Sequence, residues 1–384
     1  MDAMAHVERR EEIGIDEFVR RFLEPNVPLI LAPSHTSHWP ARQDWVTSEG
    51  LPDFGRLAAL YGAEQVPVAD CDTVYFSDQQ RTTMAMSEFI SQWQAQTQRL
   101  YCKDWHFTRS PSSYQAYAPV PHLSNDWLNI YYEDLGTDDF RFCYMGGHGT
   151  WTPFHEDVFR SYSWSANICG EKRWILVPPG QTHLFTDRLG NWVHNILDYD
   201  QRAFPRLGEL KKFEVVQKPG EALFVPSGWW HQVLNVGHTI SINHNWSNEF
   251  NLQRMYERLA QDLGNVKHAL RDVTDMDGFD DHAQLVLRAD SGIDYRGFFA
   301  FVRHMATRYM KLCAGSPPPA GNWTVDHVDS YFTSPASVRR ALEKIDSVLT
   351  LLASDPDTPK ISGGLATEIS CLRSEIKEAL LVTH

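Results

Sequence analysis

The sequence predicts a mainly β fold with added helices. A small β-barrel or jelly roll is expected at residues 100–248, between a mixed N-terminal segment (1–99) and a helical C-terminal segment (249–384). From Leu100 to Trp246, short apolar runs alternate with Gly, Pro and Asp turns, which is typical of an all-β domain. Aromatic residues make up 12% of the 384 residues, including 13 Trp, and aromatic side chains favour strands. After Asn248 the apolar residues recur at spacings of three and four, as in amphipathic helices.

The first 99 residues show mixed patterns. Residues 11–22 have helical spacing, residues 27–32 indicate a short strand, and residues 86–98 indicate a second helix. The first twelve residues are polar and carry both charge signs, unlike a signal or transit peptide. The chain has no apolar run of about 18 residues, so no transmembrane helix is expected.

Eight short strands are expected in the central segment, a number that suits a small barrel or jelly roll. They span residues 100–103, 141–145, 152–157, 165–169, 173–177, 213–216, 222–225 and 239–246. In the last of them the odd positions are small and polar, whereas Ile240, Ile242 and Trp246 share the other face. A polar inner row predicts a wet, ligand-lined interior, with Asn243 and Asn245 as pocket residues. The alternative is a polar face turned to solvent.

Four helices are expected in the last third, at residues 252–263, 295–312, 335–353 and 366–382. Their apolar stripes indicate core packing or a dimer seam. The pattern leaves open the oligomeric state and the role of residues 315–384.

Charge and cysteine content narrow the function classes. The net charge is −14, which disfavours attraction to nucleic-acid phosphates, and the basic residues are dispersed. We therefore expect neither a nucleic-acid nor a membrane partner. The six Cys are scattered without a CxxC pair, so neither a zinc ribbon nor a redox dithiol is indicated. Cys143 and Cys169 lie in apolar contexts and are expected to be buried thiols. This suggests a reducing compartment, the cytoplasm, with the nucleus as the alternative.

Three residues have the spacing of a metal site. On a strand, His155 and Asp157 at i and i+2 point to one face, and His231 follows the turn Pro226-Ser-Gly-Trp-Trp. Two His and one carboxylate leave coordination positions open, the arrangement of non-haem Fe(II) oxygenases. The His-x-Asp spacing alone is weak, because His327-Val-Asp329 repeats it in the helical segment. We expect that second pair to be solvated or capping.

Lys172 is the fourth candidate of the central segment. It lies in Gly170-Glu-Lys-Arg-Trp, at the edge of an apolar strand. Such a lysine either extends its charge to the surface or is a buried cation that binds an acidic co-substrate.

Together these motifs resemble the JmjC (jumonji C) family of Fe(II)/2-oxoglutarate oxygenases. The resemblance rests on the amino-acid sequences of the segments that begin at Tyr101, Phe159, Gly170, Phe224 and Ser241, and it covers roughly residues 10–310. Within the family, the motifs are most similar to the branch called jumonji-domain-containing protein four. Members of this branch are lysyl hydroxylases that act on a translation release factor. The resemblance implies a double-stranded β-helix (cupin) core and a protein substrate.

The resemblance also assigns roles to residues. It implies Fe(II) on His155, Asp157 and His231, with O2 as the oxidant. It places the far carboxylate of 2-oxoglutarate on Lys172, helped by Tyr101 and Thr152, and places Asn245 near the chelating end. Ser165 stands where some relatives carry Asn. Strict alternation puts Thr152 on the face opposite His155, so a bend at Pro153 is required.

Three alternatives stay open. A cupin of another enzyme class would not need Lys172 and often adds a fourth protein ligand. A non-catalytic binding module would tolerate the loss of a ligand. A JmjC histone lysine demethylase would share the iron site, but the chain has no zinc-finger reader and no basic tract.

Overall fold

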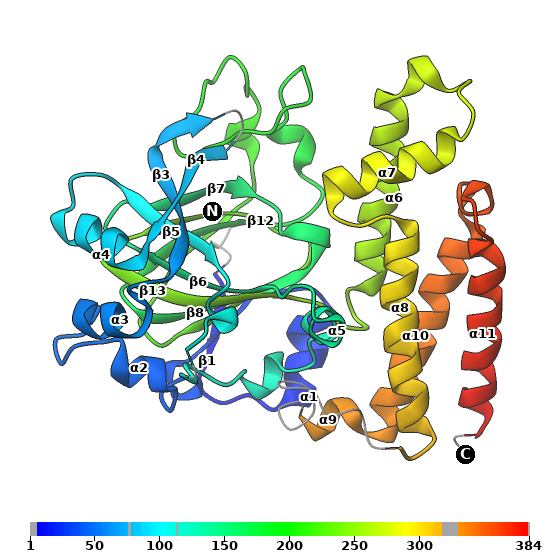
Figure 1. Ribbon diagram of the computed structural model, residues 1–384, viewed down its shortest axis with the longest axis horizontal. Helices are drawn as coiled ribbons and strands as arrows, with labels where there is room; N and C mark the ends of the chain where they lie inside the picture. The colour runs from blue at the N-terminus through cyan, green and yellow to red at the C-terminus, as the bar shows by residue number, and fades with distance from the viewer. Residues whose placement is uncertain (1–5, 76–77, 113, 317–328, 383–384) are drawn as a thin grey trace. The chain divides into compact units, whose positions relative to one another are not determined.

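The computed structural model describes residues 6–75, 78–112, 114–316 and 329–382 (Figure 1). The chain forms two compact units. The first contains the described residues up to Val120 together with Phe140–Asp157 and Tyr162–Asn245. The second contains Pro121–Asp139, Val158–Ser161 and the described residues from Trp246 onward. Two short segments of the central region thus belong to the helical unit.

The first unit holds two β-sheets. In spatial order, the larger sheet contains β1 (Glu8–Arg10), β2 (Leu29–Leu31), β11 (Ala222–Val225), β8 (Tyr162–Cys169), β13 (Thr239–Trp246), β6 (Arg141–Gly146), β5 (Leu100–Trp105), β3 (Gln65–Tyr75) and β4 (Asp78–Ala85). The smaller contains β10 (Phe213–Gln217), β9 (Lys172–Val177), β12 (Trp230–Asn235) and β7 (Trp151–His155). Strands distant in sequence are neighbours, as a jelly roll requires.

Apolar side chains occupy part of the space between the two sheets. Ile30, Leu223 and Val225 of the larger sheet form one cluster with side chains of the smaller sheet, among them Trp174 and Val233. The opposite face of the smaller sheet is also apolar: Ile175, Val177 and Trp230 pack there against residues of the 184–207 loop. Both faces of the smaller sheet are therefore covered by apolar side chains, and the face that meets the larger sheet is its inner face.

All eight expected strands are present, within three residues at each end. Two differences matter. First, β7 ends at His155, so Asp157 lies just beyond the strand and not on it, contrary to the expectation. Second, β12 is not among the eight strands whose bounds were expected, because Trp230–Asn235 is buried almost throughout and shows no apolar alternation.

The N-terminal elements fit the expectation less well. The expected helix at 11–22 begins only at α1 (Ile15–Phe18) and continues as a π-helix, η1 (Val19–Leu23). The expected strand is the shorter β2, and the expected helix at 86–98 is α4 (Met86–Ala95). The β3–β4 hairpin was missed, because four central residues of β4 are exposed and polar. The remaining helical segments of this unit are α2 (Pro40–Asp44), α3 (Phe54–Tyr61), η2 (Pro33–His35), η3 (Phe107–Arg109), η6 (Thr182–Leu184) and η7 (Leu207–Glu209).

The second unit is helical. It contains η4 (Pro121–Leu123), α5 (Trp127–Leu135), η5 (Val158–Arg160), α6 (Leu252–Ala269), η8 (Arg271–Val273), α7 (Phe279–Ser291), α8 (Tyr295–Cys313), α9 (Ser330–Thr333), α10 (Pro335–Ser354), η9 (Thr358–Lys360) and α11 (Leu365–Val382). Helices α8, α10 and α11 run side by side (Figure 1) and share one apolar core. The four expected helices are confirmed, and their stripes pack on one another within this core.

Several local expectations can be checked here. Asp329 is the N-cap of α9 and accepts a hydrogen bond from the Tyr331 N–H at 2.8 Å, so its capping role is confirmed. His327 lies outside the described residues. Cys143 and Cys169 are buried free thiols, as expected. Among the residues that the structure describes, no helix is long and apolar enough to cross a membrane.

Candidate metal and co-substrate site

Three side chains converge on the inner face of the smaller sheet. His155 ends β7 and pairs directly with His231 of β12, so the two imidazoles share one face and their ring centroids lie 4.2 Å apart. Asp157 follows two residues after His155. One ligand atom from each of the three residues lies within 4.8 Å of the other two. The structure therefore brings together the three residues that the sequence proposed as metal ligands.

The backbone orients both imidazoles. His155 Nδ1 lies 2.7 Å from the carbonyl oxygen of Pro153, and His231 Nδ1 lies 3.1 Å from that of Trp229. A carbonyl oxygen only accepts hydrogen bonds, so each Nδ1 donates its proton and each Nε2 keeps its lone pair. Burial lowers the pKa of His155, and the neighbouring His231 lowers it further. Both features favour the neutral imidazole that binds metals.

The carboxylate is held from the other sheet. Ser163 of β8 donates a hydrogen bond from Oγ to Asp157 Oδ2 at 2.7 Å. Asp157 lies outside a regular strand, so this bond replaces strand geometry in fixing its orientation. Hydrogen bonds of this kind to metal-binding carboxylates set ligand orientation. Ser163 was not predicted as a site residue, and no spacing rule identifies it.

Lys172 is buried on the same inner face. In the register of β9 and β12, Lys172 pairs with Asn235 and Leu176 pairs with His231. Residues 172 and 176 lie on the same face of β9. Four residues of strand span about 13 Å, so Lys172 lies about that far along the strand from Leu176, the neighbour of His231. Lys172 is only 2% exposed, so the alternative of a surface-reaching lysine is wrong.

The Lys172 ammonium group lacks an anionic partner. Its Nζ donates to Ser241 Oγ at 2.5 Å and to Tyr101 Oη at 3.4 Å, and lies 5.4 Å from the Tyr144 ring centroid. Within the described part of the chain, no carboxylate lies at ion-pair distance from it. Burial lowers the pKa of Lys172 to about 7. A buried ammonium group with neutral neighbours is suited to receive a carboxylate from a ligand.

A β-bulge places Thr152 on the inner face. His231 pairs with His155, but Val233 pairs with Thr152 and not with residue 153, so β7 contains one extra residue. Such a bulge reverses the alternation of side chains beyond it. The irregularity that the sequence required near Pro153 is therefore present, and Thr152 lies on the same face as His155.

The polar row of β13 faces this interior. Ser241 contacts Lys172, and Ser165 of β8 donates to Asn243 Oδ1 at 3.2 Å. These contacts exclude the alternative in which the row forms a solvent face. Asn245 lies on the same face of β13, two residues beyond Asn243. Ser241 belongs to the predicted polar row but was not predicted as a site residue, although its hydrogen bond with Lys172 is shorter than that of Tyr101.

The aromatic residues Phe154 and Trp230 do not wall the site. Phe154 and Trp230 neighbour the two His in sequence, so their side chains point to the opposite face of the sheet. There they pack against Phe185, with ring centroids 5.0 and 4.8 Å away. Their role is core packing.

Comparison with known proteins identifies the family. The model of the cupin-like domain matches residues 15–252. The chain is 35% identical over 390 residues to the 2-oxoglutarate and iron-dependent oxygenase JMJD4 of Danio rerio, covering 98% of this chain and 92% of the relative. The chain belongs to this family of oxygenases. It is 40% identical over 306 residues to JMJD4 of Homo sapiens, covering 76% of this chain and 73% of the relative.

The name of a third relative states a demethylase activity. The chain is 41% identical over 324 residues to the arginine-specific demethylase JMJ20 of Arabidopsis thaliana, covering 79% of this chain and 70% of the relative. At the level of the family, the predicted cupin fold and the predicted class of iron- and 2-oxoglutarate-dependent oxygenase are confirmed. Of these three names, only that of JMJ20 states a substrate residue, arginine.

Proposed function

We propose that this chain is an Fe(II)- and 2-oxoglutarate-dependent protein hydroxylase, with His155, Asp157 and His231 as the iron ligands. The observation that carries the proposal is the convergence of one carboxylate and two oriented imidazoles within 4.8 Å. This donor set fits iron, because two nitrogen ligands and one oxygen ligand on one side leave positions free for co-substrate and oxygen. Iron and 2-oxoglutarate, when bound, supply the oxidising chemistry that inserts oxygen into a C–H bond.

Lys172 is proposed to hold the far carboxylate of 2-oxoglutarate. Its buried, unpaired ammonium group supports this role, and Tyr101 and Ser241 would add hydroxyl donors beside it. Thr152 lies on the same inner face of the smaller sheet and would line the same pocket. Asn243, Asn245 and Ser165 line the polar row of the interior, and we propose that Asn245 lies near the end of the co-substrate that chelates iron.

The two non-oxygenase alternatives fit the site less well. A cupin enzyme that works without 2-oxoglutarate has no use for a buried ammonium group such as Lys172. A binding module has no need to keep two oriented imidazoles and a hydrogen-bonded carboxylate together. Both features are expected of an oxygenase.

We propose a lysine of a translation release factor as the substrate. The resemblance of the sequence motifs to the jumonji-domain-containing protein four branch supports this choice. The net charge of −14 also favours a basic protein segment over an acidic one.

A second candidate is removal of a methyl group from a methylated arginine. The similarity to the arginine-specific demethylase JMJ20 favours it. The same site serves both reactions, because oxygen insertion at an N-methyl carbon gives an unstable product that releases formaldehyde. The two candidates differ only in which substrate carbon is presented to the iron.

Mass spectrometry distinguishes these reactions. Purified protein with Fe(II), 2-oxoglutarate and oxygen is incubated with a release factor and, separately, with methylarginine peptides. A gain of one oxygen on a lysine supports the hydroxylase, whereas loss of methyl groups with formaldehyde release supports the demethylase. The His155→Ala variant is the matched control and should be inactive on both. Absence of succinate formation with either substrate would contradict the proposed assignments.

A further inference from the structure

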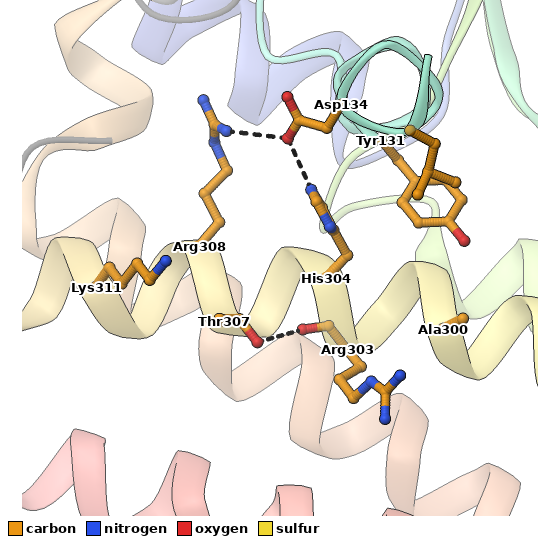
Figure 2. Close-up of a pocket in the computed structure, with 9 residues that line it drawn as sticks. Tyr131, Asp134, Ala300, Arg303, His304, Thr307, Arg308 and Lys311 are labelled. Atoms are coloured by element: carbon orange, nitrogen blue, oxygen red, sulfur yellow. Dashed lines mark hydrogen bonds and ion pairs between the residues drawn. The ribbon is translucent and has the colours of Figure 1, made fainter. Parts of the chain in front are cut away.

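The second unit contains a pocket that the proposed oxygenase site does not use. It lies between α5 and α8 and has a volume of about 390 Å³, within the range of small-molecule sites. Figure 2 shows its lining side chains, which come from one end of α5 and one face of α8. On α8 they fall at positions 300, 303, 304, 307, 308 and 311, the spacing of a single helical face.

The α8 side of this pocket is cationic. It carries Arg303, Arg308 and Lys311 with His304 between them, in a chain whose net charge is −14. Arg303 is engaged outside the pocket, at 3.4 Å from Glu368 of α11. Lys311 lies one turn beyond Thr307 and is exposed. Arg308 is paired only with Asp134, which itself lines the pocket, and Lys311 has no ion pair among the described residues, so these two cations are the ones that face a ligand.

Arg308 is the buried member of this pair. Its side chain is 7% exposed, and its Nη1 makes no hydrogen bond within the described part of the chain. The nearest carboxylate is Asp134 of α5, at 3.5 Å from Nη1, and Asp134 already accepts a hydrogen bond from His304 at 2.8 Å. Figure 2 shows both side chains reaching from α8 toward Asp134. A buried guanidinium with an unused donor is costly unless an acceptor completes its hydrogen bonding.

The α5 side of the pocket is apolar except for Asp134, whose carboxylate is already engaged by His304 and Arg308. Tyr131 packs edge-on against His304, with ring centroids 5.4 Å apart, and Leu135 is 51% exposed at the rim. A ligand that enters would contact the basic side chains of α8 on one side. On the other side it would contact an aromatic ring and an aliphatic side chain, which flank the paired carboxylate of Asp134. This pairing matches an anion carried on a small organic body.

We propose that the pocket between α5 and α8 binds the phosphate group of a small organic phosphate monoester. Arg308 and Lys311 provide the charge, and the organic part lies on Tyr131 and Leu135. A phosphate group carries nearly two negative charges and several acceptor oxygens near neutral pH, more than one carboxylate. Guanidinium groups bind it through paired N–H donors. The proposal does not depend on the oxygenase function.

Titration of the full chain with phenyl phosphate, followed by calorimetry, tests the proposal. Lys311→Gln should weaken binding about tenfold, the loss expected for one charge-assisted hydrogen bond. Lys377→Gln, which removes an exposed lysine of α11 in the same unit, should leave binding unchanged. Arg308→Gln should abolish binding, and its thermal melting is compared with that of the wild type because Arg308 is buried.

Three further probes separate the sources of affinity. Inorganic phosphate should bind more weakly than phenyl phosphate, because it lacks the group that contacts Tyr131. Phenol and glutarate should show no binding that depends on Lys311. If phenyl phosphate does not bind, or if Lys311→Gln and Lys377→Gln behave alike, the pocket is not a phosphate site. Equal binding of inorganic and phenyl phosphate would overturn the organic part of the proposal.

Discussion

Replacing Lys172 by Met should stabilise the ligand-free protein while it weakens binding of 2-oxoglutarate. Burial lowers the pKa of Lys172 from 10.5 to about 7, which corresponds to roughly 5 kcal/mol of free energy against the charged form in the folded state. Methionine removes that cost and fills similar volume. It also removes the hydrogen bonds to Ser241 and Tyr101, a loss of roughly 1–3 kcal/mol. We therefore expect a net gain of about 2–4 kcal/mol.

The sign of this effect depends on pH in a defined way. The folded chain holds the Lys172 proton more weakly than the unfolded chain, so the unfolded chain binds more protons between about pH 7 and pH 10.5. Wild-type stability therefore rises with pH across that window. The advantage of Lys172→Met should be full below about pH 7 and should disappear as the pH approaches 10.5.

Urea unfolding of both proteins without ligand, at about pH 6 and about pH 9.5, measures the difference. Saturating 2-oxoglutarate should reverse the order of stability, because only the wild type gains from binding. If Lys172→Met is less stable than the wild type at the lower pH, or if the difference does not change with pH, the ammonium group is not an uncompensated buried charge.

Three further outcomes are expected. Binding of 2-oxoglutarate should take up close to one proton at about pH 8, because its carboxylate restores the charge of Lys172; calorimetry in buffers of different ionisation enthalpy would contradict this if no proton moved. Ser163→Ala should weaken metal binding roughly 10- to 100-fold by freeing Asp157, measured by competition with a chelator, and an unchanged affinity would exclude the positioning role. Gly170→Ala should destabilise the fold more than Gly180→Ala in urea unfolding. Both glycines have positive φ, but only at Gly170 would a Cβ lie 2.2 Å from a backbone oxygen. At Gly180 the substitution should lower the free energy of unfolding by roughly 1–2 kcal/mol, the cost of the left-handed backbone alone. Equal losses of stability in the two variants would argue against the close approach at Gly170.

Strong local patterns made the core predictable. The strands around His155 and Lys172 have apolar runs bounded by turn residues, and the four expected helices have clear stripes with capping residues such as Asp294. The β3–β4 hairpin and β12 lack such patterns for opposite reasons. Most of β4 is exposed and polar, whereas β12 is buried almost throughout. Neither gives the alternation that reveals a half-buried strand.

The site residues also differ in how well the sequence predicts them. His155, Asp157, His231 and Lys172 are recognisable from residue type and spacing. Ser163 is not, because its role depends on a contact between β8 of the larger sheet and the residues that follow β7 of the smaller sheet. The bulge that turns Thr152 inward is intermediate between these cases. Strict alternation showed that a distortion was required near Pro153, but only the pairing with β12 fixes where the extra residue lies.

We propose above all that His155, Asp157 and His231 hold one iron ion. Equilibrium dialysis under anaerobic conditions measures Fe(II) bound per folded chain for the wild type and for His155→Ala, with His183→Ala as a control that removes an exposed histidine. We expect one Fe(II) per chain in the wild type and in His183→Ala, and loss of tight binding in His155→Ala. Unchanged Fe(II) binding by folded His155→Ala would show that the metal is held elsewhere.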